Sequence, residues 1–313
     1  MKKGIILFGI LAVLFLFTAC GAKEDIDNSE NVLAESIGQT EKNSTEKSSE
    51  STNEIVPTIS ATESKDDLSA GSVLVAEQIL TGTDGDIHYS YYLPEDFDES
   101  RKYPMMVVMP GYDMMWFGED SSGSNLNWRG FLAWTELDED LIVVSAQLTD
   151  WREKSARQAI ELTEYFLDNF PVDVNRVYAA GYSAGGETMS QAVSMRPDLY
   201  AAYLHGASRW DGAFEPVAEN SVAVYIFMAE NDEYYGSQKA RDAYQGLYEA
   251  YQNAEWTQAQ IDEVLQIEIP DNEYFNSRGI CNYHGGGNIL FEDQSILQWI
   301  VEKKEQSRKL NSE

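Results

Sequence analysis

The feature that most restricts the fold is a Gly-Tyr-Ser-Ala-Gly sequence, residues 181–185, which follows an apolar run at 176–180. The run has the residue types of a buried strand, and the segment from Ala184 to about Met195 has those of a helix. Small residues on both sides of Ser183 permit a turn so sharp that larger side chains would clash. The pattern predicts a strand that turns directly into a helix and exposes the Ser183 hydroxyl. The alternative is a glycine-rich turn with a passive serine.

Short apolar runs alternate with helical patterns from about Ser72 onward. Residues 73–80 and 87–93 are predicted to form an antiparallel pair of strands, because turn residues separate them. Strands that alternate with helices indicate an α/β fold with a mostly parallel central sheet and helices on both faces. Further strands are predicted at 105–109, 141–146 and 222–228, and helices at 155–170, 237–251 and 293–304.

A serine hydroxyl becomes a good nucleophile only with a base beside it, and the base needs a partner that fixes its tautomer. The chain contains three histidines. Where a nucleophilic serine lies on such a strand-to-helix turn, the acid and then the histidine follow it along the chain. His284, in a Tyr-His-Gly-Gly-Gly sequence expected to be a flexible loop, fits this order best and is the predicted base.

The acid is expected in the loop after the strand at 222–228. Asp232 is the preferred candidate, and Glu230 in the same loop is the alternative. An oxyanion formed at the substrate carbonyl would need backbone donors. We expect these to be the amides of Ala184 and of Tyr112, since Gly111 permits a turn after the strand at 105–109. This chemistry requires no metal or cofactor.

Five segments of the sequence, which are named below, together resemble one branch of the α/β-hydrolase superfamily. That branch includes prolyl-oligopeptidase-like catalytic domains and feruloyl or polyhydroxybutyrate-type esterases. The resemblance covers about residues 72–305 and implies hydrolysis through an acyl-enzyme. In that branch the third strand usually ends in His-Gly, whereas here it ends in Pro110-Gly111. The segments that carry the resemblance are Tyr91-Tyr92-Leu93-Pro94, Met109-Pro110-Gly111-Tyr112, Val177 to Gly186, Glu230-Asn231-Asp232 and Tyr283-His284-Gly285-Gly286-Gly287.

Prolyl oligopeptidases carry a large gating domain, and the segment before residue 72 is short. This favours an esterase, with a peptidase as the alternative because both perform the same acyl transfer. A third hypothesis is a binding lipoprotein that has kept the fold without the activity.

The N-terminus indicates export. Lys2 and Lys3 precede an apolar run that is short for a membrane span, so residues 1–19 are predicted to be a signal peptide. Phe17-Thr18-Ala19-Cys20 resembles the bacterial lipobox, which implies that a lipid on Cys20 anchors the protein to the outer side of the cell membrane. The alternative is an ordinary signal peptide that happens to contain a cysteine.

Residues 20–71 are rich in Ser, Thr, Glu and Lys and contain no aromatic side chain. Such a composition predicts a disordered tether, which leaves residues 72–313 as the catalytic domain. The formal net charge of the chain is −31. A surface of this charge repels nucleic acid, so we expect a small-molecule or oligomeric ester or peptide substrate.

Aromatic residues are frequent in the segment from Asp113 to Thr135, where a substrate pocket or lid is expected. They either line an acyl or sugar site or pack beneath a long loop. His205 and Trp210 are expected to follow the next strand, where they could face the cleft, although core packing is the preferred role for His205. The candidates in the first segment are Trp116, Phe117, Trp128 and Trp134.

Overall fold

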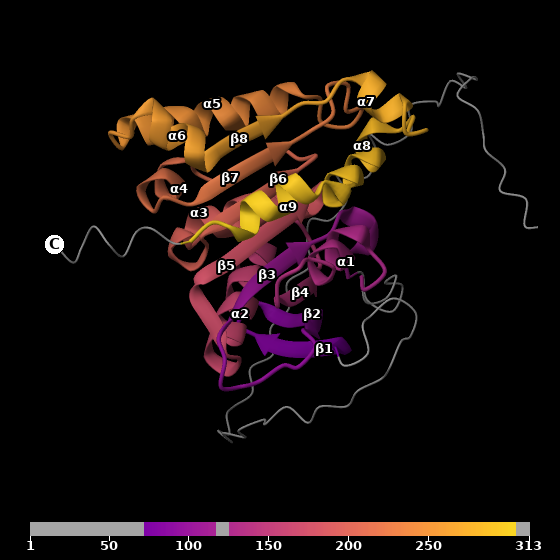
Figure 1. Ribbon diagram of the computed structural model, residues 1–313, viewed down its shortest axis with the longest axis vertical. Coiled ribbons are helices and arrows are strands. Elements are labelled where there is room, and N and C mark those ends of the chain that lie inside the picture. Colours follow the sequence, from indigo (N-terminus) through magenta and orange to yellow (C-terminus); the bar gives the residue numbers. More distant parts are fainter. Residues whose placement is uncertain (1–71, 117–124, 305–313) are drawn as a thin grey trace, which may run out of the picture. The chain divides into compact units, whose positions relative to one another are not determined.

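The computed structural model describes residues 72–116 and 125–304 (Figure 1). The predicted signal peptide, Cys20, the tether and Phe117 lie outside these residues. The described residues form a sheet of eight strands in the order β1-β2-β4-β3-β5-β6-β7-β8. The strands are β1 (Val73–Gly82), β2 (Gly85–Leu93), β3 (Tyr103–Met109), β4 (Ile142–Gln147), β5 (Val172–Tyr182), β6 (Ala202–Gly206), β7 (Ala223–Phe227) and β8 (Leu265–Glu268).

Strand β2 pairs in antiparallel fashion with both β1 and β4, and all the remaining neighbours are parallel. The predicted antiparallel opening pair and the mostly parallel sheet are therefore confirmed. Every residue of β3 and β4 is buried, as their largely apolar sequences predict for strands covered on both faces.

Helices cover the two faces of the sheet (Figure 1). On one face α2, α3, α4 and α5 contact each other in succession, and on the other α1 and α9 pack against the strands and against η4. The helices are α1 (Arg129–Thr135), α2 (Glu153–Asn169), α3 (Ala184–Met195), α4 (Glu215–Glu219), α5 (Gln238–Asn253), α6 (Gln258–Val264), α7 (Asn272–Asn276), α8 (Tyr283–Gly286) and α9 (Gln294–Val301), with short 3₁₀ helices η1 (Tyr112–Met114), η3 (Pro197–Leu199) and η4 (Gly287–Glu292).

The strand β8 and the short helices α1, α4, α6, α7 and α8 were not predicted. Strand β8 has four residues, of which three are half-buried, so it carries little of the apolar signal that marks the central strands. Strand β5 begins at Val172, earlier than predicted. Its first half is polar and partly exposed, so the sequence there lacks the apolar run that marks a buried strand.

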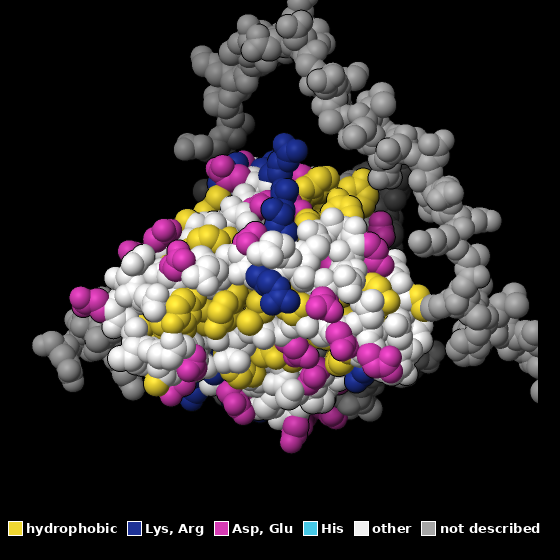
Figure 2. All heavy atoms as spheres, turned by 90° about the horizontal axis from the view of Figure 1, so that it is seen from above, with side chains coloured by type: hydrophobic (Ala, Val, Ile, Leu, Met, Phe, Trp, Pro, Cys, Tyr) yellow, Lys and Arg dark blue, Asp and Glu magenta, His cyan; other side chains and the backbone are white. Residues whose placement is uncertain are grey.

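Figure 2 views the molecule from the side where α5, α7 and β8 lie in Figure 1. Asp and Glu side chains are spread over this face around a band of hydrophobic side chains, and Lys and Arg are fewer. Within the described residues, no helix is both long and apolar enough to cross a lipid bilayer.

Candidate active site

Ser183 lies at the junction of β5 and α3 with φ +53° and ψ −122°. Glycine is required on both sides of it. A side chain at Gly185 would overlap the backbone carbonyl of Met109, and one at Gly181 would overlap the backbone of Gly185. The close contact between β3, β5 and the start of α3 therefore sets the sharp turn that the sequence predicted.

Hydrogen bonds with the end of β6 and with the loop that follows it hold this turn. The Ser183 amide donates to the Gly206 carbonyl at 3.0 Å, and the Ser208 hydroxyl donates to the Ser183 carbonyl at 2.7 Å. Ser208 is in turn bound by His205, whose Nε2 donates to the Ser208 carbonyl at 3.2 Å.

His205 lies within β6 and is fully buried. The expectation that it follows the strand was wrong, and the preferred role in core packing agrees with its burial. Burial lowers the pKa of His205 to about 4, because a charged imidazolium loses its hydration in the core. The side chain is therefore neutral at pH 7.

The structure brings together the three side chains that the sequence singled out. Ser183 Oγ lies 2.9 Å from His284 Nε2, and His284 Nδ1 lies 2.8 Å from Asp232 Oδ2. Since an ionised carboxylate can only accept, Nδ1 carries the hydrogen and Nε2 is free to accept the Ser183 proton. The arrangement can generate a serine nucleophile.

Asp232 is buried, whereas Glu230 in the same loop is exposed, and Asp232 is the residue that contacts His284. Burial disfavours the Asp232 carboxylate, but hydrogen bonds from His284 and from the backbone amides of Tyr235 and Tyr234 outweigh it, so its pKa is lowered. Asp232 is thus ionised at neutral pH and stabilises a positive charge on His284.

His284 belongs to the short helix α8, not to the flexible loop that was expected. Its backbone is bound on both sides. The amide donates to Glu233 Oε2 at 2.6 Å, and the carbonyl accepts a hydrogen bond from the Tyr182 hydroxyl. These contacts connect residues 51 and 102 positions apart in the sequence, and no local pattern indicated them.

Two consecutive tyrosines surround the His284 ring. Tyr234 stacks on it with ring centroids 5.1 Å apart, and Tyr235 meets it edge-on at 5.5 Å. Tyr234 is 73% exposed, so it forms the solvent side of the site. Sequence reasoning missed both residues, although they directly follow the predicted acid loop.

A buried carboxylate lies behind the second tyrosine. Glu187, in the first turn of α3, is 4% exposed and accepts hydrogen bonds from the Tyr235 hydroxyl and, at 2.9 Å, from Arg209. Burial raises the pKa of Glu187, and these two partners oppose the rise. Glu187 therefore links Tyr235, whose ring packs against His284, to Arg209.

The predicted oxyanion donors both belong to segments that adjoin the nucleophile. Ala184 is the first residue of α3. A Cβ atom on Gly111 would lie 3.5 Å from the Ser183 Cβ, so the end of β3 approaches the serine closely. Tyr112 follows at the start of η1, and its exposed ring packs edge-on against Trp151 at 5.6 Å.

The described tryptophans of the segment after β3 pack against neighbouring side chains, and two of them are buried. Trp134 is fully buried in the core, and Trp128 is 5% exposed and donates from Nε1 to Asn288 at 2.9 Å. Trp116 stacks on His88 with centroids 3.5 Å apart. Trp210 packs partly buried against Tyr203 and His205. Trp134 is therefore a core residue and not part of a pocket wall.

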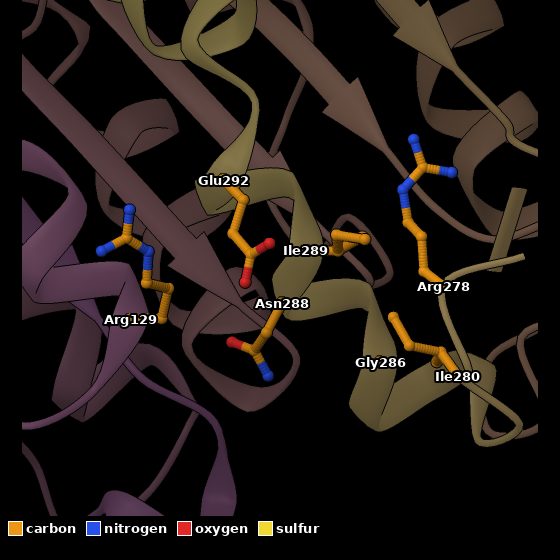
Figure 3. A pocket seen from close by; sticks show the side chains of 7 residues that line it. All are labelled: Arg129, Arg278, Ile280, Gly286, Asn288, Ile289 and Glu292. Atoms are coloured by element: carbon orange, nitrogen blue, oxygen red, sulfur yellow. The ribbon is translucent and has the colours of Figure 1, made fainter.

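A pocket of about 430 Å³ lies on another side of α8, where Gly286 forms part of its wall. None of Ser183, Asp232 and His284 lines it. Figure 3 shows Arg129 and Arg278 at opposite ends of this pocket, with Asn288 and Glu292 between them, so the two positive charges do not converge.

In the described part of the chain, no three His, Cys, Asp or Glu side chains are grouped as metal ligands.

Comparison with known proteins agrees with this architecture. Residues 145–261 match the prolyl oligopeptidase family; this part contains Ser183 and Asp232 and ends before His284. No curated protein sequence matches the chain at a significant level.

Several solved structures share the fold. A thermostable esterase superposes with a TM-score of 0.62 and 21% identity, over 74% of this chain and 63% of the esterase. A carboxylesterase from Lactobacillus plantarum gives 0.53 and 14%, over 73% of this chain and 97% of that chain. A protein described as a dipeptidyl aminopeptidase IV from Bacteroides ovatus gives 0.52 and 15%, over 74% and 36%. The chain thus spans 63% of the length of the thermostable esterase. The predicted α/β-hydrolase fold is confirmed.

Proposed function

We propose that the protein is a serine hydrolase that cleaves carboxylic esters through an acyl-enzyme. The observation that carries the proposal is the continuous line of hydrogen bonds from Ser183 through His284 to the buried Asp232. In combination with the strand-to-helix turn that presents Ser183, this line has the geometry of a nucleophile, a base and an orienting acid.

In the proposed reaction Ser183 Oγ attacks the ester carbonyl while its proton passes to His284 Nε2. Asp232 stabilises the imidazolium that forms, and the amides of Ala184 and Tyr112 bind the oxyanion. Collapse of the tetrahedral intermediate breaks the ester bond, and the leaving alcohol takes the proton from His284. Water then attacks the acyl-enzyme by the same route and releases the acid and Ser183.

Two findings bear on the choice between ester and peptide. The described fold superposes on the thermostable esterase with a TM-score of 0.62 and on the dipeptidyl aminopeptidase-like protein with 0.52, which supports an esterase. The match of residues 145–261 to the prolyl oligopeptidase family supports a peptidase as the second candidate, because the acyl transfer is common to both.

The N-terminal sequence supports a location on the outer side of the cell membrane, anchored through a lipid on Cys20. Replacing Cys20 by serine should release the protein from the membrane fraction. Retention of the Cys20→Ser variant in that fraction would contradict the anchor.

The activity can be tested with the purified full chain in detergent. Short p-nitrophenyl esters and acyl-prolyl anilides serve as competing substrates, and a fluorophosphonate probe reports the nucleophile. We expect ester turnover and labelling, both reduced to background in Ser183→Ala. Preferential anilide cleavage would replace the esterase by the peptidase, and the absence of turnover and labelling would leave a non-catalytic binding lipoprotein.

A further inference from the structure

The segment that carries His284 has little burial to hold it. No residue from Asn276 to Gly286 is buried, and the hydrophobic contacts of this segment with the core come from the partly buried side chains of Ile280 and Tyr283. A helix of four residues is also too short to be stable alone. The position of His284 therefore depends strongly on polar contacts with other parts of the fold.

Glu233 supplies two of these contacts. Its Oε1 accepts the Tyr283 amide at 2.8 Å and its Oε2 accepts the His284 amide at 2.6 Å. These are the first two amides of α8, which have no partner within the helix. The negative charge of Glu233 also lies at the positive end of the helix, where it is favourable.

The remaining exposed amides of the helix are satisfied locally. The Asn282 side chain accepts from the Gly285 amide at 2.6 Å, and the Asn282 carbonyl accepts from the Gly286 amide at 2.8 Å. Among these acceptors of the α8 amides, Glu233 is the one that comes from a distant segment, the loop after β7. It connects the backbone of the base to the loop that also supplies the acid.

We propose that Glu233 is a positioning residue that fixes the backbone of His284, while its neighbour Asp232 fixes the ring. Two consecutive carboxylates then hold one histidine at two points, and the imidazole stays aligned with both Ser183 and Asp232. Alignment of this kind matters because a displacement of about 1 Å in a catalytic group can cost about a hundredfold in rate. The inference rests on the proposed function for its effect on rate, but not for its effect on structure.

The test compares Glu233→Ala, Glu233→Gln and a matched control, Glu230→Ala, in the full chain. Glu230 lies in the same loop and is exposed, so its replacement removes the same charge without touching α8. We expect kcat for a p-nitrophenyl ester to fall about tenfold in Glu233→Ala with KM within about twofold. Glu233→Gln retains one acceptor and should fall by about threefold, and Glu230→Ala should stay within about twofold of wild type.

Hydrogen exchange provides a second measurement that does not depend on activity. The amides of Tyr283 and His284 should exchange faster in Glu233→Ala than in wild type or Glu230→Ala. Unchanged exchange in Glu233→Ala, or an equal loss of kcat in Glu230→Ala, would overturn the inference. Faster exchange in a protein without esterase activity would instead contradict the proposed function and leave the anchoring role intact.

Discussion

Ser183 and His284 come from two regions that are held in place in different ways. Ser183 is fixed by the backbone of the sheet, since β3, β5 and α3 approach so closely that Gly181 and Gly185 admit no side chain. His284 lies in a helix of one turn that is only half-buried, bound through Glu233 and Tyr182. Changes near the serine should therefore affect folding, whereas changes near the histidine should affect catalysis and leave the fold intact.

The largest effect is expected from His284→Ala. Removal of the base should lower kcat/KM by at least about a thousandfold, equivalent to roughly 4 kcal/mol of transition-state stabilisation. Because α8 buries no residue, the urea midpoint should remain close to that of wild type. A large loss of stability in this variant would show that the histidine region also supports the fold.

Next in size is the effect of Gly185→Ala on folding. The new methyl group would overlap the carbonyls of Met109 and Pro110, and backbone atoms cannot move aside as a flexible side chain can. We expect a loss of about 3 kcal/mol or more in the free energy of unfolding, measured by urea denaturation. The matched control is Gly285→Ala, where the methyl group would meet the Asn282 side chain at 3.2 Å and should cost less than about 1 kcal/mol.

His205 should make the serine region sensitive to acid. Its pKa is about 4 in the folded protein and about 6.5 when unfolded, so between these values the unfolded chain binds more protons. Stability due to the neutral side chain is therefore lost as the pH falls below 6.5. From pH 7 to pH 5, wild type should lose about 2 kcal/mol more than His205→Gln, as measured by urea denaturation at both pH values. Parallel losses in the two proteins would contradict this.

The smallest effect is expected from Tyr182→Phe. The substitution removes the hydroxyl that binds the His284 carbonyl, a bond worth about 1 kcal/mol. Burial raises the pKa of Tyr182, so the hydroxyl is a donor at all ordinary pH values. We expect kcat/KM for a p-nitrophenyl ester to fall by about three- to tenfold, and an unchanged value would show that Glu233 alone is sufficient.

The parts of the site that obey local rules could be predicted from the sequence. The turn at Ser183 needs glycine at fixed positions between a strand and a helix, and Asp232 follows a strand that an apolar run reveals. Strands β3 and β4 could be predicted because strands covered on both faces have largely apolar sequences.

The parts that rest on contacts across the fold could not be predicted. Glu233 resembles any exposed carboxylate in a loop, and its contact with the His284 amide spans 51 residues. The Glu187–Tyr235 pair spans 48 residues and has no local pattern either. The sequence likewise cannot distinguish a tryptophan that lines a pocket from one that is buried, and Trp134 is buried in the core.

The backbone of Ser183 has a consequence for how the chain tolerates change. Its φ of +53° lies in a region that residues with a Cβ atom occupy only at a cost of about 1–3 kcal/mol. Glycine would adopt the same conformation without that cost. A protein selected for folding alone would gain by exchanging Ser183 for glycine, so the serine reflects a selective demand other than stability.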